Sequence, residues 1–162
     1  YQVTSMMEGV VQRGTATVVR EVGRPIAGKT GTTNDYNDAW FIGFSPNLVV
    51  GVFVGYDTPA SLGTNTGGSL AAPIFTEFMK VALAGQPPTP FRVPYGISLI
   101  PIDRRTGLRS EGGEGVILEA FKPGTSPPDS YSIIGYTDDL GRPLTVAPEA
   151  DRAVVLGTGG LY

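Results

Sequence analysis

The chain has 162 residues, of which 41% are hydrophobic and 17% are charged, and a net charge of −3. These values describe a globular domain with a proper core, and the scattered Lys and Arg residues indicate no nucleic-acid partner. The absence of Cys and His excludes a thiol nucleophile, a disulfide framework, a Ser-His-Asp triad and nearly all catalytic zinc sites. No apolar stretch reaches the ~18 residues of a membrane helix, so we expect no membrane contact by this segment.

The first third of the chain predicts two helical segments and then a strand. Residues 1–13 carry apolar side chains at intervals of three and four, which indicates an amphipathic helix that stops at Gly14. Residues 15–23, TATVVREVG, fit either a short helix or a strand, and we favour a helix. Residues 24–33 hold one Pro, two Gly and three Thr, so an extended strand is the better interpretation.

The clearest structural signal is DAWFIGFSPNLVVGVFVGYD, residues 38–57. Two apolar runs, residues 39–44 and 48–56, flank the turn-forming residues 45–47, which predicts a β-hairpin. Neither run alternates cleanly between apolar and polar residues. We therefore expect an α+β fold in which helices cover both faces of an antiparallel sheet.

A helix is expected after the Gly- and Thr-rich loop of residues 57–68. Ser69 would cap this helix, Pro73 is tolerated in its first turn, and the helix would run through about Leu83 before Gly85 ends it. Its apolar stripe indicates that it lies across the sheet.

The composition changes after residue 86, where QPPTP marks a boundary. We therefore expect one domain in residues 1–86 and a Gly- and Pro-rich extension in residues 87–162. Within this extension the sequence predicts short strands at 97–103 and 116–121, with a turn at 104–107.

The segment GRPIAGKTGTT, residues 23–33, fits two different chemistries. Residues 23–30 match G-x-x-x-x-G-K-T, the phosphate-binding P-loop. A P-loop requires a buried parallel strand before it and a helix after it. Neither flank fits, since TVVREVG carries two charged residues, GTTNDYND is a poor helix former, and the apolar strand that follows pairs through a tight hairpin. These flanks therefore argue against a nucleotide hydrolase.

The alternative motif is K-T-G, which one group of serine acyl-transferases carries on a strand. An edge strand would offer the Lys29 ammonium and the hydroxyls of Thr30 and Thr32, with the two threonines on one face and Lys29 on the other. Gly31 leaves room for a second backbone or a substrate to approach. Such a set suits a peptide that ends in a carboxylate, although the tripeptide by itself favours a plain strand edge with a solvated lysine.

Longer stretches resemble one protein family. The string AGKTGTTNDYNDAWFIGFSP, residues 27–46, is similar to the transpeptidase domain of the penicillin-binding proteins, and specifically of the class A peptidoglycan synthases. The resemblance continues in MMEGVVQRGTAT, GVFVGYDTPASLG and TGGSLAAPIFTEFM, so that it covers residues 1–86. The phrases PIDRRTG and ILEAFKPGTSP resemble the extension after the catalytic domain in some class A members.

The resemblance implies a five-stranded antiparallel sheet between helical layers, with K-T-G on the third strand. It also implies a reaction in which a serine attacks the D-Ala-D-Ala end of a peptidoglycan stem peptide, releases D-Ala and passes the acyl group to an amine. β-Lactams mimic that terminus and trap the serine. The implied partners are stem peptides and β-lactams, the implied location is periplasmic or otherwise extracytoplasmic, and no cofactor or metal is implied.

The family's site residues transfer to a short segment of this chain. Lys29 would raise the positive potential and assist proton transfer, and the backbone N–H of Thr32 would donate to the oxyanion. Thr30 and Thr32 would hold the substrate carboxylate. The candidate site therefore has Lys29 and Thr32 as catalytic residues and Thr30, Gly31, Thr32 and Thr33 as substrate-binding residues.

Two motifs of the family are missing. No S-x-x-K, which would supply the nucleophile and its base, occurs in the 162 residues. The one S-x-N, at residues 45–47, follows K-T-G in the wrong order. We therefore expect that both motifs precede Tyr1 in a longer protein, and that the N-terminal half of the same transpeptidase domain is a partner of this chain. The alternatives are a D,D-carboxypeptidase, a β-lactamase-like hydrolase and a binding module without catalytic activity.

Overall fold

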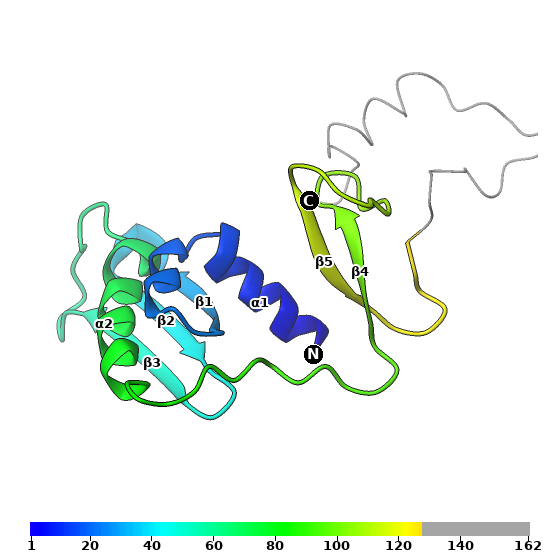
Figure 1. Cartoon of the computed structure of the whole chain (residues 1–162). Helices are drawn as coiled ribbons and strands as arrows, with labels where there is room; N and C mark the ends of the chain where they lie inside the picture. Colours follow the sequence, from blue (N-terminus) through cyan, green and yellow to red (C-terminus); the bar gives the residue numbers. More distant parts are fainter. Residues whose placement is uncertain (128–162) are drawn as a thin grey trace, which may run out of the picture. The chain divides into compact units, whose positions relative to one another are not determined.

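A computed structural model describes residues 1–127, which belong to two units (Figure 1). The first unit is Tyr1–Pro94, and the second begins at Tyr95. The division falls within the Pro-rich stretch where the composition of the sequence changes. Residues 128–162, the last part of the extension predicted for residues 87–162, lie outside the described residues.

The first unit contains the helices and strands that the sequence predicted for residues 1–86. In chain order they are α1 (Gln2–Arg13), the 3₁₀ helix η1 (Thr17–Val22), β1 (Ala27–Thr32), the 3₁₀ turn η2 (Asn34–Tyr36), β2 (Asp38–Phe44), β3 (Val49–Gly55), the π-helical turn η3 (Gly67–Ala71) and α2 (Ala72–Ala82). The first helix, the K-T-G strand and the hairpin are confirmed, and the ambiguous segment after Gly14 is helical, as favoured.

The three strands form one antiparallel sheet in the order β1-β2-β3. In this register Thr30 pairs with Phe41, and Lys29 pairs with Ile42. Paired residues point to the same side of a sheet, so Thr30 and Phe41 share one face while Lys29 and Ile42 share the other. We call these the inner face and the outer face. β1 lies at one edge of the sheet, with β2 as its neighbour.

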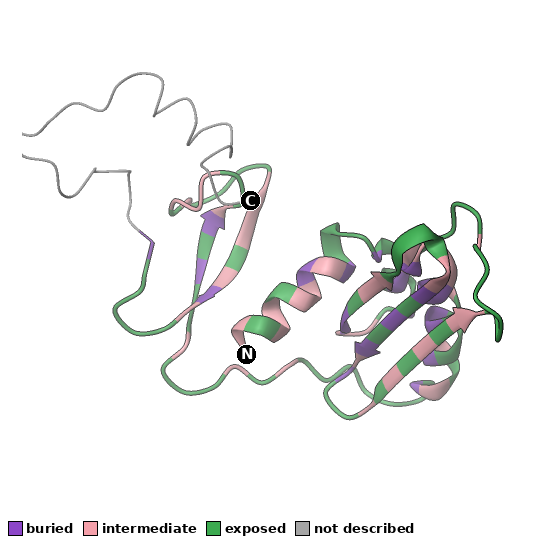
Figure 2. Ribbon diagram, turned by 180° about the vertical axis from the view of Figure 1, so that it is seen from behind, coloured by how far each residue is buried: buried purple, intermediate pink, exposed green. Residues whose placement is uncertain are grey.

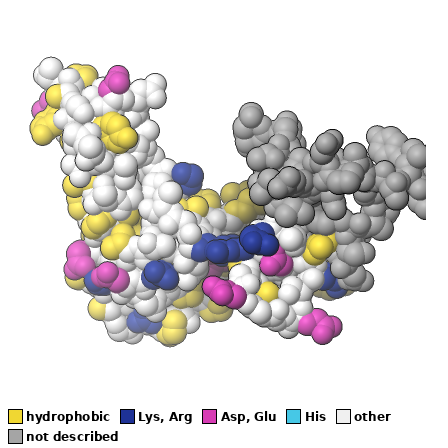
Figure 3. All heavy atoms as spheres, turned by 90° about the horizontal axis from the view of Figure 1, so that it is seen from above, with side chains coloured by type: hydrophobic (Ala, Val, Ile, Leu, Met, Phe, Trp, Pro, Cys, Tyr) yellow, Lys and Arg dark blue, Asp and Glu magenta, His cyan; other side chains and the backbone are white. Residues whose placement is uncertain are grey.

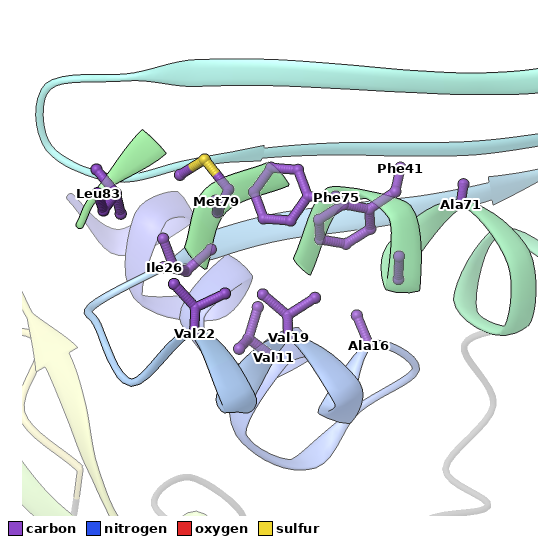
Figure 4. Packing of buried hydrophobic residues seen from close by; sticks show 11 residues of the cluster. Val11, Ala16, Val19, Val22, Ile26, Phe41, Ala71, Phe75, Met79 and Leu83 are labelled. Carbon is purple, nitrogen blue, oxygen red and sulfur yellow. The ribbon is translucent and has the colours of Figure 1, made fainter. Parts of the chain in front are cut away.

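The inner face of the sheet packs against the helices. Phe41 of β2 is fully buried, and its ring contacts that of Phe75 in α2 edge-on, with 4.7 Å between centroids. Figure 4 shows these rings beside other core side chains, which come from α1, η1, η3, α2 and the residues next to them: Val11, Ala16, Val19, Val22, Ile26, Ala71, Met79 and Leu83. One core therefore joins the helices to a single face of the sheet.

The outer face of the sheet is apolar but stays accessible in the described residues. Along β2 buried and exposed residues alternate (Figure 2), and the exposed ones include Trp40 and Ile42. Trp40 stacks on Phe53 of β3, with centroids 4.6 Å apart, yet Phe53 is itself exposed. The space-filling view also shows hydrophobic side chains at the surface of this unit (Figure 3). The α+β class is confirmed, and within residues 1–127 the helical core covers the inner face.

The last helix begins earlier than predicted, and Thr66 rather than Ser69 is its cap. The N–H of Ser69 donates to Oγ1 of Thr66 at 3.2 Å, and the N–H of Thr66 donates to Oγ of Ser69 at 2.8 Å. This reciprocal capping box starts the π turn η3, which continues into α2. The prediction was wrong by three positions because Ser69 has the role that Glu or Gln usually plays in such a box.

An ion-pair cluster joins η1 to α2 on the surface. The ammonium of Lys80 lies 2.7 Å from a carboxylate oxygen of Glu77 and 3.0 Å from one of Glu21. Hydrogen bonds to Glu77 and then to Glu21 raise the pKa of Lys80 above its ordinary value. Because Lys80 is partly exposed and both carboxylates are exposed, water screens these contacts and their effect on stability is small.

In the second unit, β4 (Ser98–Asp103) and β5 (Val116–Phe121) pair as an antiparallel ribbon, which confirms both predicted strands. Oδ1 of Asp103 closes the predicted turn by accepting hydrogen bonds from the N–H groups of Thr106 and Arg105, each at 2.9 Å. These bonds, led by that of Thr106, hold the pKa of the Asp103 carboxyl below its usual range. The carboxylate is thus a structural part of the turn.

Candidate functional site

The K-T-G strand β1 presents alternate backbone groups at the open edge of the sheet. The N–H of Thr33 donates to the carbonyl of Asp38 on β2 at 3.1 Å. Because the amides of an antiparallel edge strand point alternately toward the neighbour and away from it, the N–H of Gly31 also faces β2. The N–H groups of Thr30 and Thr32 consequently face outward. The amide predicted as an oxyanion donor is therefore oriented away from the sheet.

Lys29 begins on the outer face but its ammonium reaches this same edge. Its Nζ donates to the carbonyl oxygen of Thr30 at 2.9 Å, and the side chain is exposed. That carbonyl faces outward together with the N–H of Thr30. As predicted, the Cβ of Lys29 points to the opposite face of the strand from those of Thr30 and Thr32. The rest of the Lys29 side chain then bends back, so that its ammonium lies at the strand edge. The cation and the outward amides thus lie along one edge.

The hydroxyls of Thr30 and Thr32 lie on the inner face, and each contacts a residue far away in sequence. Oγ1 of Thr30 is 2.8 Å from Oγ1 of Thr15, which follows α1. Oγ1 of Thr32 accepts a hydrogen bond from the N–H of Gly67, at the start of η3, at 3.1 Å. The segments that follow α1 and precede α2 therefore meet at the K-T-G strand.

Thr33 lies one residue beyond β1 and its hydroxyl belongs to the turn that follows. It donates to Oδ2 of Asp38 at 3.2 Å and accepts from the N–H of Asp38 at 2.8 Å. The next residues, Asp35 and Tyr36, adopt left-handed backbone conformations with φ of 60° and 56°, which are costly for residues other than glycine. A loop residue, Leu62, donates its N–H to the carbonyl of Tyr36 at 2.7 Å and holds this turn in place.

Two glycines allow η3 to approach the sheet. A Cβ on Gly67 would meet the carbonyl oxygens of Trp40 and Gly31, and a Cβ on Gly68 would meet the carbonyl oxygen of Thr15. A Cβ on Gly31 would lie 3.2 Å from Cβ of Trp40. Gly67 thus approaches the backbone of Gly31 from the inner face, whereas the space left by the missing side chain of Gly31 lies on the outer face beside Trp40.

The structure also argues against the P-loop and against the S-x-N match. The segment after Lys29 is an antiparallel strand and a short turn, so the strand-to-helix geometry of a P-loop is absent from residues 23–36. Ser45, which begins the S-x-N match, follows Phe44, and Phe44 pairs with Ala27 at the end of β1 distant from Thr32. That match therefore lies at the other end of the sheet.

The described part of the chain holds no group of three or more Asp, Glu, His or Cys side chains arranged to bind a metal ion. Within the same residues, no helix has the length and hydropathy that crossing a membrane requires. The groups that the β1 strand presents are backbone amides, the hydroxyls of Thr30 and Thr32 and the Lys29 ammonium.

Comparisons with known proteins identify the family. Residues 1–80 match the model of the penicillin binding protein transpeptidase domain. The chain belongs to this family, which confirms the resemblance to class A penicillin-binding proteins. It is 51% identical over 123 residues to penicillin-binding protein 1A of Rickettsia bellii, an alignment that covers 75% of this chain and 15% of that protein.

A more distant curated relative and a solved structure agree with this assignment. Penicillin-binding protein 1A of Aquifex aeolicus is 44% identical over 124 residues, covering 75% of this chain and 17% of that protein. The crystal structure of penicillin-binding protein 1A from Haemophilus influenzae aligns with a TM-score of 0.68 and 34% identity, over 79% of this chain and 20% of that one. The chain thus spans a small part of the length of these relatives.

Sequence reasoning missed the residues that contact the two threonine hydroxyls. Thr15 had no signal of its own, because a threonine after a helix-ending glycine is ordinary in a turn. The pair Gly67 and Gly68 did carry a signal, since two glycines directly before a helix indicate a close backbone approach. The partner of that approach became visible only in the folded chain.

Proposed function

We propose that the protein containing this chain is a serine-type peptidoglycan D,D-transpeptidase, and that the open edge of β1 is one wall of its active site. The observation that carries this proposal is the set of groups at that edge: the outward N–H of Thr32, the Lys29 ammonium and the neighbouring hydroxyls of Thr30 and Thr32. Hydrogen-bond donors and a cation in one place suit a ligand that combines a carboxylate with a reacting carbonyl.

Each residue has a distinct role in this proposal. The N–H of Thr32 stabilises the oxyanion that forms when a serine attacks the carbonyl of the penultimate D-Ala. The Thr30 and Thr32 hydroxyls donate to the terminal carboxylate, and Gly31 lets the substrate backbone lie close to the strand. Lys29 adds positive potential and assists the proton transfer that accompanies attack.

Thr33 contributes less directly in this scheme. Its hydroxyl would have to exchange its bonds with Asp38 for a bond to the substrate, so we assign the carboxylate to Thr30 and Thr32. Thr33 would then support the site by holding the turn after β1.

The serine and its base would come from the N-terminal half of the same transpeptidase domain, which would pack on the exposed outer face. Residues 1–86 would complete that domain, and residues 87–162 would form an extension after it. Cross-linking of stem peptides places this reaction on the extracytoplasmic side of the membrane, with β-lactams as inhibitors that acylate the same serine.

Acylation of the full-length protein by a fluorescent penicillin tests these roles. Lys29→Met should lower the second-order acylation rate about 100-fold, because proton transfer loses its assistance. Thr30→Val and Thr32→Val should each lower it about 10-fold through a lost bond to the carboxylate. Thr17→Val, at an exposed threonine at the start of η1, is the control and should keep the wild-type rate. Wild-type rates in both Lys29→Met and Thr30→Val would refute the proposal.

Two readouts separate the alternatives. The 162-residue chain by itself should take up no label, because it has no S-x-x-K, and a covalent adduct on it would contradict the assignment of the nucleophile. In the full-length protein the acyl-enzyme should accumulate and turn over slowly. Rapid release of hydrolysed penicillin would instead support a β-lactamase-like hydrolase.

A further inference from the structure

The two threonine hydroxyls of β1 differ in the kind of partner they contact. Thr32 is bonded by the backbone N–H of Gly67, which can only donate, so Oγ1 of Thr32 is the acceptor. In the described residues, the O–H of Thr32 donates to no protein acceptor. Its proton is therefore available to a ligand without any rearrangement.

Thr30 faces another hydroxyl, and either oxygen can be the donor. When Thr15 donates, Thr30 accepts and its own proton can point toward a ligand. When Thr30 donates, its proton is used within the protein. A negatively charged ligand selects the first arrangement, because a hydroxyl that accepts one hydrogen bond becomes a stronger donor in the next.

We propose that Thr15 is a positioning residue for carboxylate recognition, acting through Thr30 as Gly67 acts through Thr32. The inference rests on the function proposed above and adds two parallel hydrogen-bond chains to it. One runs from the Thr15 hydroxyl to the Thr30 hydroxyl and then to the carboxylate. The other runs from the Gly67 N–H to the Thr32 hydroxyl and then to the carboxylate.

The packing of η3 holds both chains in place. Gly67 lies against the carbonyl oxygens of Gly31 and Trp40. Gly68 lies against the carbonyl oxygen of Thr15, and a Cβ added to Gly68 would be 3.7 Å from Cγ2 of Thr30. No other residue allows this approach, because a Cβ at either position would collide with backbone atoms. The Gly67-Gly68 pair therefore fixes the turn that carries Thr15 and the strand that carries Thr30 in one geometry.

The test uses acylation of the full-length protein, with the non-covalent dissociation constant of benzylpenicillin and the acylation rate constant measured separately. Thr15→Val removes the hydroxyl at nearly constant shape. The variant should raise the dissociation constant for benzylpenicillin about fivefold and leave the acylation rate constant unchanged. Thr15→Ser, which keeps a hydroxyl, should restore wild-type binding, and Thr17→Val is the matched control. The methyl ester of benzylpenicillin, which lacks the anionic carboxylate, should bind the wild type and Thr15→Val equally.

Several outcomes would overturn the inference. If Thr15→Val lost the same affinity for benzylpenicillin as for its methyl ester, Thr15 would act on the fold rather than on the carboxylate. The same would follow if Thr15→Ser did not restore the affinity for benzylpenicillin. A loss in the acylation rate constant alone would have the same consequence. If Thr30→Val and Thr32→Val weaken binding while Thr15→Val does not, the proposed function stands and this inference fails. If none of the three has an effect, the proposed carboxylate site itself fails.

Gly67→Ala provides a second, independent arm. The added Cβ must displace the N–H from Thr32, so carboxylate binding should weaken about as much as in Thr32→Val, with the same indifference toward the ester. A melting curve of the variant establishes that the protein is folded. Carboxylate binding at the wild-type level in a folded Gly67→Ala protein would contradict the role of the Gly67 amide.

Discussion

The inner and outer faces of the three-stranded sheet carry similarly apolar residues and have different surroundings. On β2 the neighbours Trp40 and Phe41 point to opposite faces, and their exposed fractions are 40% and 0%. Phe41 packs on a helix through Phe75, whereas Trp40 finds its ring partner, Phe53, within the sheet itself. Apolar side chains on both faces of a strand indicate that both faces are to be buried, and the described residues of the first unit supply the cover for one.

The largest expected effect comes from removing whatever covers the outer face. We expect the 162-residue chain alone to lack a cooperative monomeric unfolding transition and to self-associate, because its outer face and sheet edges stay exposed. Calorimetry with analytical ultracentrifugation measures both properties, and the full-length protein is the comparison. A sharp transition from a monomeric chain would show that the inner core suffices.

Truncating one large apolar side chain on each face sharpens the comparison. Phe41→Ala should destabilise the transpeptidase domain by about 3–5 kcal/mol, since it empties a fully buried site. Ile42→Ala, one position away on the outer face, should cost about 2–4 kcal/mol if a partner segment covers it and below about 1 kcal/mol if it stays exposed. Denaturant unfolding of the full-length protein measures both values. A small cost for Ile42→Ala would contradict the burial of the outer face.

Adding a methyl group tests the packing of the two faces with glycines of adjacent strands. A Cβ on Gly43 would lie 2.6 Å from Cε1 of Phe41 and 2.7 Å from Cζ of Phe75, so Gly43→Ala should cost about 1–3 kcal/mol through overpacking. Gly51→Ala is the control on the outer face, where the nearest atom is Cγ1 of Ile42 at 3.8 Å. The same unfolding measurement applies, and a cost below about 1 kcal/mol for Gly43→Ala would argue against a tightly packed inner face.

The smallest expected effect concerns the surface contacts of Lys80. Its pKa is raised in the folded state, so its stabilisation is fully present below the ordinary value of 10.5 and is lost as the pH rises through the raised value. Lys80→Met should therefore lower the melting temperature slightly at neutral pH and low salt, and less at high salt. Lys80→Arg keeps the charge and serves as the control. A salt-independent difference would indicate lost packing instead.

The local elements of the first unit follow directly from the sequence. Helix α1 follows from the spacing of its apolar residues, and the hairpin follows from the turn residues 45–47. Both patterns extend over a few positions, so neighbouring residues are sufficient to predict these elements. The strand character of residues 24–33 follows in the same way, since Pro, Gly and Thr disfavour a helix. The cap at Thr66 was missed because both Thr66 and Ser69 are good capping residues, and their roles depend on backbone geometry.

The sequence predicts which segment carries the candidate site, but not how the residues around that segment are arranged in space. Lys29, Thr30 and Thr32 stand out because their residue types and order form a known motif. The contacts of Thr30 with Thr15 and of Thr32 with Gly67 span 15 and 35 positions, and no local pattern encodes them. Likewise, the bend that brings the Lys29 ammonium back to the strand edge is a property of the folded side chain.

By itself, the sequence determined the strand that carries the motif, the hairpin beside it and the exclusion of chemistries that need Cys or His. Only the tertiary structure decided which face of the sheet the helices of the first unit cover, and which groups meet the two threonine hydroxyls. The physical reason is one of distance along the chain. Propensities and turns depend on adjacent residues, whereas the packing of η3 and the segment after α1 against β1 depends on residues that come together only when the chain folds.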